Sequence, residues 1–321
     1  MADSKRVVVA AGVANAAISV LKFVGFLLTG SPSMLSETYH SLSDTGNQVF
    51  LLVGLRYSDR QADRTHPFGY GKAQFFYSFL VSVLLFGIAG WASLSHGYEA
   101  IVHAGSAEFG EPVRLLGYQF RAVYVNYAVL AGAFVFEGGA LRTAYRGMRA
   151  DMSEHGWGDI PEAFRKTSNI TTLTAFTEDT VAVTGIALAF LGVLLSDYTG
   201  SELWDGLAAV CIGVLLMGFA LALAWENKRL LLGESLPKKE EDELRETVAG
   251  WEGVTGIPDF RTVYFGPNRV IVAADVAFDA GLDTDDIDSR ITAIEDALVE
   301  ENPHVKKVYI EPETTESTGG N

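Results

Sequence analysis

Cysteine is almost absent from this sequence of 321 residues. The single residue of this type, Cys211, lies within an apolar stretch. One cysteine cannot form a disulfide within the chain, and it excludes a metal site built from several thiolates. Neither a disulfide-stapled fold nor a multi-cysteine metal centre fits this chain.

Basic residues are also scarce, with 24 Lys and Arg against 40 Asp and Glu and a formal net charge of -16. Nucleic-acid binding needs basic patches that neutralise phosphates, so an acidic surface disfavours it. Most of the acid lies in the last third of the chain, where it can attract cations or keep the protein soluble at high salt. We favour solubility because the acid is spread rather than focused, and a halophilic source is therefore a hypothesis.

Sequence motifs of enzymes are missing as well. No glycine-rich loop ends in Lys-Ser or Lys-Thr, so ATP hydrolysis is not expected as an energy source. No Ser-His-Asp or Cys-His set stands near a segment expected to face water. We predict that the chain is not an enzyme and holds no tightly bound cofactor.

Long apolar runs, in contrast, are abundant in the first 230 residues. A membrane-spanning helix needs about 20 mainly apolar residues. Six stretches meet that need, at about 7–29, 34–57, 75–97, 122–146, 169–195 and 202–225. The sequence therefore predicts a transmembrane domain of six helices over residues 1–230.

Lys and Arg collect at alternate ends of these stretches. They precede the first stretch, occupy the links from second to third and from fourth to fifth, and follow the sixth. The link 30–33 and the link 196–201 carry none, and the link 98–121 carries only two. Cytoplasmic loops are enriched in Lys and Arg, so we expect a multi-pass protein of the cell membrane with both termini in the cytoplasm.

The residues after 230 have the pattern of a small α+β domain. A helix capped by Ser235 is expected to run to about residue 249, and a second helix to begin at Asp283. Strands are expected at 260–265, 269–278 and 305–311. The order αββαβ fits a ferredoxin-like or metallochaperone-like domain over 231–314, with helices on one face of a three-stranded sheet. Residues 315–321 are predicted to be a disordered tail.

Two metal-ligand types occur together in the second apolar stretch. His40 and Asp44 are four residues apart, so a helix places them on one face about 6 Å apart. An imidazole nitrogen and a carboxylate oxygen can then bind one divalent cation. Glu37 and Asn47 flank that face. Ionisable groups at the bilayer centre cost at least about 2.5–3.5 kcal/mol, so they usually line a site or pathway, although a hydrogen bond between helices remains the alternative.

The fifth apolar stretch contains the adjacent carboxylates Glu178 and Asp179. Neighbouring residues on a helix point about 100° apart, so both cannot face one point. We expect one of them to join His40 and Asp44 and the other to support the site or take a proton, and we favour Asp179 as the ligand. A protonated glutamate packed against lipid or a hydroxyl is the alternative.

Further polar residues have weaker claims. Glu137 lies well inside the fourth stretch and is either paired with Arg142, near the cytoplasmic end, or part of an ion route. His66 lies in the turn-rich link between the second and third stretches, where a solvated histidine is as plausible as a role in metal delivery. Lys22 is interpreted as polar glue between helices, and Asp205 as a cap.

Two segments resemble the cation diffusion facilitator family. The first reads Thr29-Gly-Ser-x-x-Met-Leu-x-Glu-x-x-His40-Ser-x-x-Asp44-x-x-Asn47-Gln, and the second reads Asp63-x-x-His66-Pro-Phe-Gly-Tyr-Gly-Lys72. Trp204-Asp-Gly206 and the acidic tail match as well. The resemblance implies a homodimer paired through its tails, in which each protomer exports zinc, iron, manganese or a similar ion in exchange for protons by alternating access.

One departure from the family pattern lies in the fifth stretch. The family usually has His or Asp there, followed by Asp four residues later, whereas Ala175 precedes Asp179 and Ala182 follows Glu178 at that spacing. The Glu178-Asp179 pair resembles the branch of the family that carries Glu-Asp at this place. A site with one imidazole and several carboxylates suits zinc, iron or manganese without choosing among them.

Other functions are open on the residues alone. A membrane-anchored metal-binding or interaction protein would use the helices as a scaffold, and a passive cation channel would conduct regardless of a proton gradient. Buried His and acid on two separate stretches favour a transporter over a scaffold. Metal binding to His and carboxylate releases protons, which is the minimal chemistry of an antiporter.

Overall fold

The computed structural model describes residues 2–104, 112–115, 118–155, 158–160, 163 and 170–313. It consists of two compact units, Met1–Leu52 with Ser78–Ala224 and Val53–Tyr77 with Trp225–Asn321. The predicted disordered tail, 315–321, lies outside the described residues.

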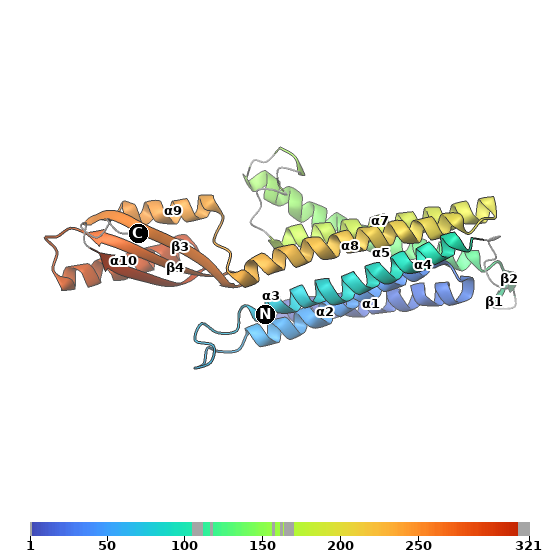
Figure 1. Ribbon diagram of the computed structural model, residues 1–321, viewed down its shortest axis with the longest axis horizontal. Helices are drawn as coiled ribbons and strands as arrows, with labels where there is room; N and C mark the ends of the chain where they lie inside the picture. The colour runs from blue at the N-terminus through green and yellow to red at the C-terminus, as the bar shows by residue number, and fades with distance from the viewer. Residues whose placement is uncertain are drawn as a thin grey trace. The chain divides into compact units, whose positions relative to one another are not determined.

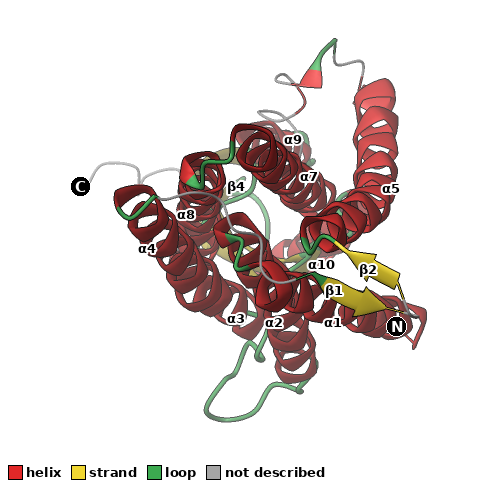
Figure 2. Cartoon of the chain, turned by 90° about the vertical axis from the view of Figure 1, so that its right-hand side faces the viewer, coloured by secondary structure: helices red, strands yellow, loops and turns green. Residues whose placement is uncertain are grey.

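Long helices occupy all six apolar stretches, as the hydropathy pattern predicts. The first unit holds most of their length, and these helices run side by side in Figure 1 and are seen nearly end-on in Figure 2. They are α1 (Ala2–Thr29), α2 (Pro32–Ser58), α3 (Ala73–Val81) with η1 (Ser82–Phe86) and α4 (Gly87–Val102), α5 (Val123–His155), α7 (Ile170–Thr199) and α8 (Leu203–Leu232).

Four helices in the described part of the chain are long and apolar enough to cross a membrane by composition alone. They span Ala73–Val102, Val123–Ala150, Ala175–Thr199 and Leu203–Leu232. In α1, the residues with described side chains include a shorter apolar segment, Val13–Thr29. The remaining long helix, α2, is more polar because it carries Glu37, His40 and Asp44 along its length. The helix that falls short on hydropathy is therefore the one that holds His40 and Asp44.

Two details of the helical unit were not predicted. The third stretch is interrupted by one π-helical turn, η1, between α3 and α4. The link before α5 contains an antiparallel pair, β1 (Val113–Leu115) and β2 (Tyr118–Phe120). Strands of three residues are too short for an alternating pattern to reveal them.

Small residues let α4 and α8 approach each other closely. A Cβ added at Gly97 would lie 2.7 Å from the Val210 nitrogen, and one at Gly213 would lie 2.7 Å from the Leu94 nitrogen. The Ser93 hydroxyl donates a hydrogen bond of 3.1 Å to the Ala209 carbonyl across the same interface. Without a hydrophobic driving force between helices in lipid, such close packing is a main source of their association.

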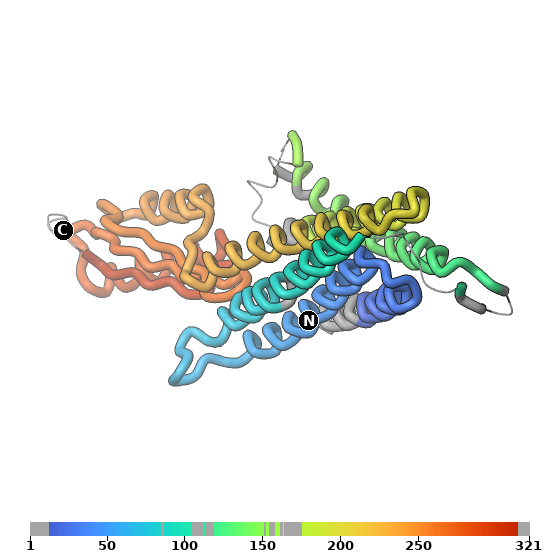
Figure 3. Tube along the Cα trace, turned by 45° about the vertical axis from the view of Figure 1, so that its right-hand side comes forward, coloured from blue at the N-terminus to red at the C-terminus, as the bar shows by residue number. Residues whose placement is uncertain are grey.

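The C-terminal part of the second unit has the predicted αββαβ order (Figure 3). The central strand β4 pairs antiparallel with β3 and parallel with β5. The β3–β4 turn contains Asn268 with φ of 54°, a value that asparagine tolerates well. Its elements are α9 (Lys238–Ala249), β3 (Val254–Gly266), β4 (Arg269–Phe278), α10 (Thr284–Glu301) and β5 (Val305–Glu313).

Alternate residues of β4 build the core of this domain. Val270, Val272, Ala274, Val276 and Phe278 are all buried in one cluster, as the two-residue period of a strand requires. Buried residues of the two helices complete the same cluster. They are Leu244 and Val248 on α9 and Ile294 and Leu298 on α10.

Of the two N-caps predicted for the C-terminal helices, one is present in the structure and the other is not. Asp283 caps α10, because its side chain accepts a hydrogen bond of 2.9 Å from the Asp286 nitrogen. The expected cap at Ser235 is wrong, since α9 begins after Pro237 and has no side-chain cap. Proline presets φ near the helix start and explains the later beginning.

Candidate metal-transport site

His40 and Asp44 lie one turn apart on α2, inside the helical unit. The Nε2 atom of His40 is 3.6 Å from the Oδ2 atom of Asp44. Both residues are buried, with exposed fractions of 1% and 5%. Their juxtaposition follows from the four-residue spacing on one helix.

Helix α7 brings Glu178 to the same region. The Glu178 carboxyl is hydrogen-bonded to the Asn47 side chain on α2 and interacts electrostatically with Asp44. Nearer the start of α2, the same two helices approach again, since a Cβ at Gly185 of α7 would lie 2.5 Å from Oε1 of Glu37. Helices α2 and α7 are therefore in direct contact on both sides of the His40–Asp44 pair.

Asp179 lies in a different environment from its neighbour. It interacts electrostatically with Glu137, a buried residue of α5. Glu137 also interacts with Asp44 and with Glu178. The predicted acids from α2, α5 and α7 thus form one electrostatic group, in which Glu178 contacts α2 and both α7 carboxylates interact with Glu137.

Glu37 forms an ion pair with a lysine of α1. The Nζ atom of Lys22 lies 2.7 Å from Oε2 of Glu37 and 2.9 Å from the Ser41 hydroxyl. Lys22 is 1% exposed, and Glu37 is fully buried. Glu37 is therefore an ion-pair partner at the border of the site.

The described residues contain no group of three or more His, Cys, Asp or Glu side chains arranged to hold a metal ion. Within that part of the chain His40 and Asp44 form a pair of metal-ligand types, and Glu178 interacts electrostatically with Asp44. The Oδ1 atom of Asp44 is buried and has no hydrogen-bond partner among described groups. An imidazole nitrogen and carboxylate oxygens are donors that zinc, iron and manganese accept.

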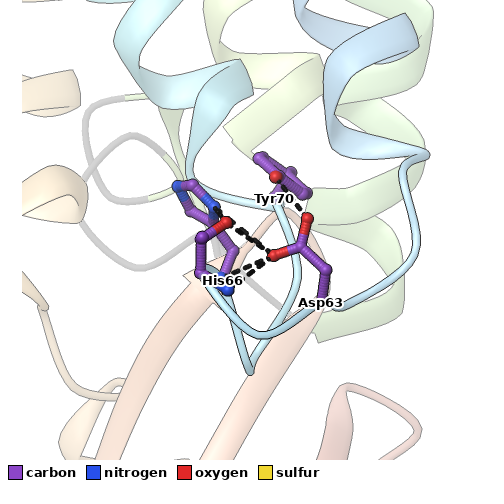
Figure 4. Close-up of polar contacts among 4 residues, drawn as sticks. Asp63, His66 and Tyr70 are labelled. Carbon is purple, nitrogen blue, oxygen red and sulfur yellow. Dashed lines mark hydrogen bonds and ion pairs between the residues drawn. The ribbon is translucent and has the colours of Figure 1, made fainter.

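His66 lies in the link between α2 and α3, which belongs to the second unit. Its ring stacks on Tyr70 with centroids 4.1 Å apart, and its Nδ1 atom is 3.8 Å from Oδ1 of Asp63 (Figure 4). Asp63 accepts hydrogen bonds from the Thr65 hydroxyl and the Tyr70 hydroxyl and from the His66 nitrogen. These bonds hold the pKa of Asp63 well below its usual value, so His66 belongs to a tightly bonded turn.

Asp205, expected to be a simple cap, instead joins three helices of the first unit. It accepts a short hydrogen bond from the Ser33 hydroxyl at the start of α2. Its backbone nitrogen donates to the Ser196 hydroxyl on α7 at 3.0 Å. The sequence shows no sign of this cluster, because its members are 9 and 172 residues from Asp205.

Comparison with protein families assigns both parts of the chain. Residues 8–232 match the cation efflux transmembrane domain, and residues 236–315 match the cytoplasmic domain of cation efflux proteins. The first match alone covers more than half of the chain.

Individual relatives agree with this assignment. The human proton-coupled zinc antiporter SLC30A9, mitochondrial, is 29% identical over 305 residues, which cover 92% of this chain and 51% of the relative. Metal tolerance protein C4 of Arabidopsis thaliana is 26% identical over 86% of this chain and 57% of its own length. The cation-efflux pump FieF of Klebsiella pneumoniae is 27% identical, over 83% of this chain and 78% of the pump.

The chain spans about half the length of the human and plant relatives that it matches. The described fold agrees with the two family matches, since apolar helices precede an αββαβ domain. The buried ligand types on α2 agree with a family whose name refers to cations. The chain is a multi-pass membrane protein that belongs to the cation efflux family of transporters, also called the cation diffusion facilitator family.

Proposed function

We propose that this chain exports a divalent metal ion in exchange for protons. The observation that carries the proposal is the buried His40–Asp44 pair on α2, with Glu178 of α7 in contact with the same helix. A divalent ion, as the transported substrate, would bind to the imidazole and to the carboxylates of two helices. Because α2 and α7 both contribute, a change in their spacing would alter the affinity of the site.

Glu178 is the favoured third ligand in this proposal, in place of Asp179. Its hydrogen bond to Asn47 and its interaction with Asp44 support the choice. Asp179 and Glu137 then form the acidic surroundings of the site and a route for the ion or for protons. His66 has no ligand role in the proposal, because its ring stacks on Tyr70 within a bonded turn.

Proton exchange follows from the chemistry of the ligands. A metal ion binds deprotonated histidine and carboxylates, so binding releases protons and protonation releases the metal. The name of the human relative, a proton-coupled zinc antiporter, supports zinc as the first ion to test. The name of the bacterial relative, a cation-efflux pump, supports export of a cation. Ligand chemistry alone is equally compatible with iron and manganese.

Assembly and orientation complete the proposal. The match of residues 236–315 to a cytoplasmic domain supports a C-terminal domain in the cytoplasm. The surplus of Lys and Arg at alternate helix links supports both termini on that side of a cell membrane. We propose a homodimer that pairs through this domain, as the family resemblance implies.

Transport into sealed vesicles tests the proposed function. The purified chain is reconstituted, a pH gradient is imposed, and uptake of zinc, iron, manganese and cobalt is followed with an indicator dye. Wild-type protein should transport at least one of these ions only when the gradient is present. His40→Ala and Asp44→Ala should lose that uptake, while Val135→Ala, a change at an exposed position of α5, should keep it.

Two outcomes would contradict the proposal in different ways. Equal uptake by wild type, His40→Ala and Asp44→Ala would remove the site from the mechanism. Uptake that ignores the pH gradient would indicate a passive channel instead of an exchanger.

A further inference from the structure

Lys22 is a charged residue on the buried side of a membrane helix. It is 1% exposed, and among the residues whose side chains are described it is the only buried Lys or Arg. Its neighbours along α1 point the other way and are exposed. They are Val20, Leu21, Phe23 and Val24.

The ammonium group lies at the border of the proposed metal site. It contacts Glu37 at 2.7 Å and Ser41 at 2.9 Å, two residues of α2 that are one turn apart. It also interacts electrostatically with His40 and Asp44 on α2 and with Glu137 on α5. One positive charge therefore acts on the acids of α2 and on Glu137 of α5.

Stability does not explain this placement. Removing two charges from water costs several kcal/mol per ion, and apolar residues in place of a buried ion pair are often neutral or stabilising. A lysine near the middle of a membrane helix adds an insertion cost. The position of Lys22 beside the acids offers a functional reason for these costs.

We propose that Lys22 is the internal counter-cation of the metal site and sets its affinity for the transported ion. The inference rests on the proposed function. When no metal is bound, the ammonium group balances part of the negative charge of Glu37, Asp44 and Glu137. When a divalent ion is bound, the same charge repels it and speeds its release, so Lys22 lowers affinity and raises turnover.

Three variants of the full-length protein that lack one or both charged groups test this role, and Lys22→Arg, which keeps the charge, is their control. Lys22→Met removes the positive charge at similar length, and Glu37→Gln removes its ion-pair partner. The double variant removes both charges and leaves the net charge as it is in the wild type. Equilibrium dialysis measures zinc binding to each detergent-purified protein, and vesicle uptake gives the kcat and KM for zinc.

If Lys22 is the counter-cation, the two single substitutions should shift the zinc affinity in opposite directions. Lys22→Met should bind zinc at least about tenfold more tightly and have a lower kcat, because the repulsion of a divalent ion is lost. Glu37→Gln should bind zinc at least about tenfold more weakly, since the charge of Lys22 is then unpaired. The double variant should return close to wild-type affinity, and Lys22→Arg, which keeps the charge, should not gain affinity.

The outcomes separate this inference from the proposed function. Zinc binding that is the same in wild type and His40→Ala overturns the proposed function. Binding that needs His40 but is unchanged by Lys22→Met overturns the inference alone, and leaves Lys22 as a link between helices. If Lys22→Met does not fold, the double variant is compared with Glu37→Gln, and equal zinc affinity in those two proteins also overturns it.

Discussion

Neighbouring carboxylates on α7 have different partners, and the difference can be measured. Both residues interact electrostatically with Glu137, but Glu178 also contacts Asn47 and interacts with Asp44. We expect Glu178→Gln to lower zinc affinity by at least about tenfold, the least that lost metal-site contacts usually cost. Asp179→Asn should lower it less, because the proposal does not make Asp179 a ligand.

Equilibrium dialysis of the two variants side by side checks the assignment. Each substitution removes one negative charge from the same turn of α7, so each variant is the charge control for the other. A greater loss of affinity in Asp179→Asn than in Glu178→Gln would contradict the choice of ligand and favour Asp179, as expected from the sequence.

The turn around Asp63 should respond to acid. Hydrogen bonds from Thr65, Tyr70 and the His66 nitrogen hold its pKa below the usual value, which is about 3.9. A carboxylate with a lowered pKa stabilises the turn above that usual value, and the contribution is lost as the pH falls through and below it. Protection of the Thr65 and His66 amides against hydrogen exchange should therefore be high at pH 6 and decline below about pH 4.

Asp63→Asn is the matched control for that experiment. The amide is similar in size but cannot become charged, so protection in this variant should be low and independent of pH after correction for intrinsic exchange. Protection that declines with pH equally in both proteins would show that another group governs the turn. The side chain of Asp63 is half exposed, and salt should weaken the effect.

At the scale of elements, the interface of α4 and α8 depends on glycine. A Cβ at Gly213 would lie 2.7 Å from the backbone nitrogen of Leu94 and 2.9 Å from the carbonyl oxygen of Gly90. Backbone atoms cannot move aside without displacing their helix. We expect Gly213→Ala to lower the free energy of unfolding by about 1–3 kcal/mol, the usual cost of overpacking.

Gly218, on the same helix, provides the control. A Cβ there meets no described atom within 4 Å. Alanine is the better helix former, so Gly218→Ala should leave the stability unchanged or raise it by up to about 1 kcal/mol. Thermal unfolding in detergent compares the two variants, and equal midpoints would mean that α4 and α8 are not closely packed.

The elements that the sequence predicted share a strong periodic signal. The apolar stretches and the αββαβ order follow from hydropathy and alternation, and the structure has both. The β1–β2 pair and the π-helical turn η1 carry no such signal. The contacts of Lys22, Glu178 and Asp205 depend on which helices become neighbours, and local spacing along one helix cannot reveal that.

At the scale of the whole molecule, the C-terminal domain has a core of its own. Among the described residues, its buried cluster takes members from both helices and all three strands, and none from the first unit. We expect the fragment 234–313 to fold alone and unfold cooperatively. Leu298→Ala in this fragment should cost about 2–5 kcal/mol, because Leu298 is completely buried.

Val299→Ala is the neighbouring control on α10, since Val299 is 44% exposed. It should change the stability by no more than about 0.5 kcal/mol. Urea unfolding followed by circular dichroism measures both variants. A fragment without a cooperative transition would show that this domain needs the rest of the chain to fold.

Each edge of the C-terminal sheet carries a proline. Pro258 lies in β3 where the pairing with β4 shifts register, and Pro312 lies in β5 opposite Val276. Proline lacks the amide hydrogen that a further strand would need, and the exposed Lys306 and Lys307 discourage strand addition at the β5 edge. A sheet that continues from one copy into the next is therefore disfavoured. In the proposed homodimer, two copies of this domain would have to meet through side chains on their faces, where a change in one surface residue could tune or abolish the pairing without disturbing the fold.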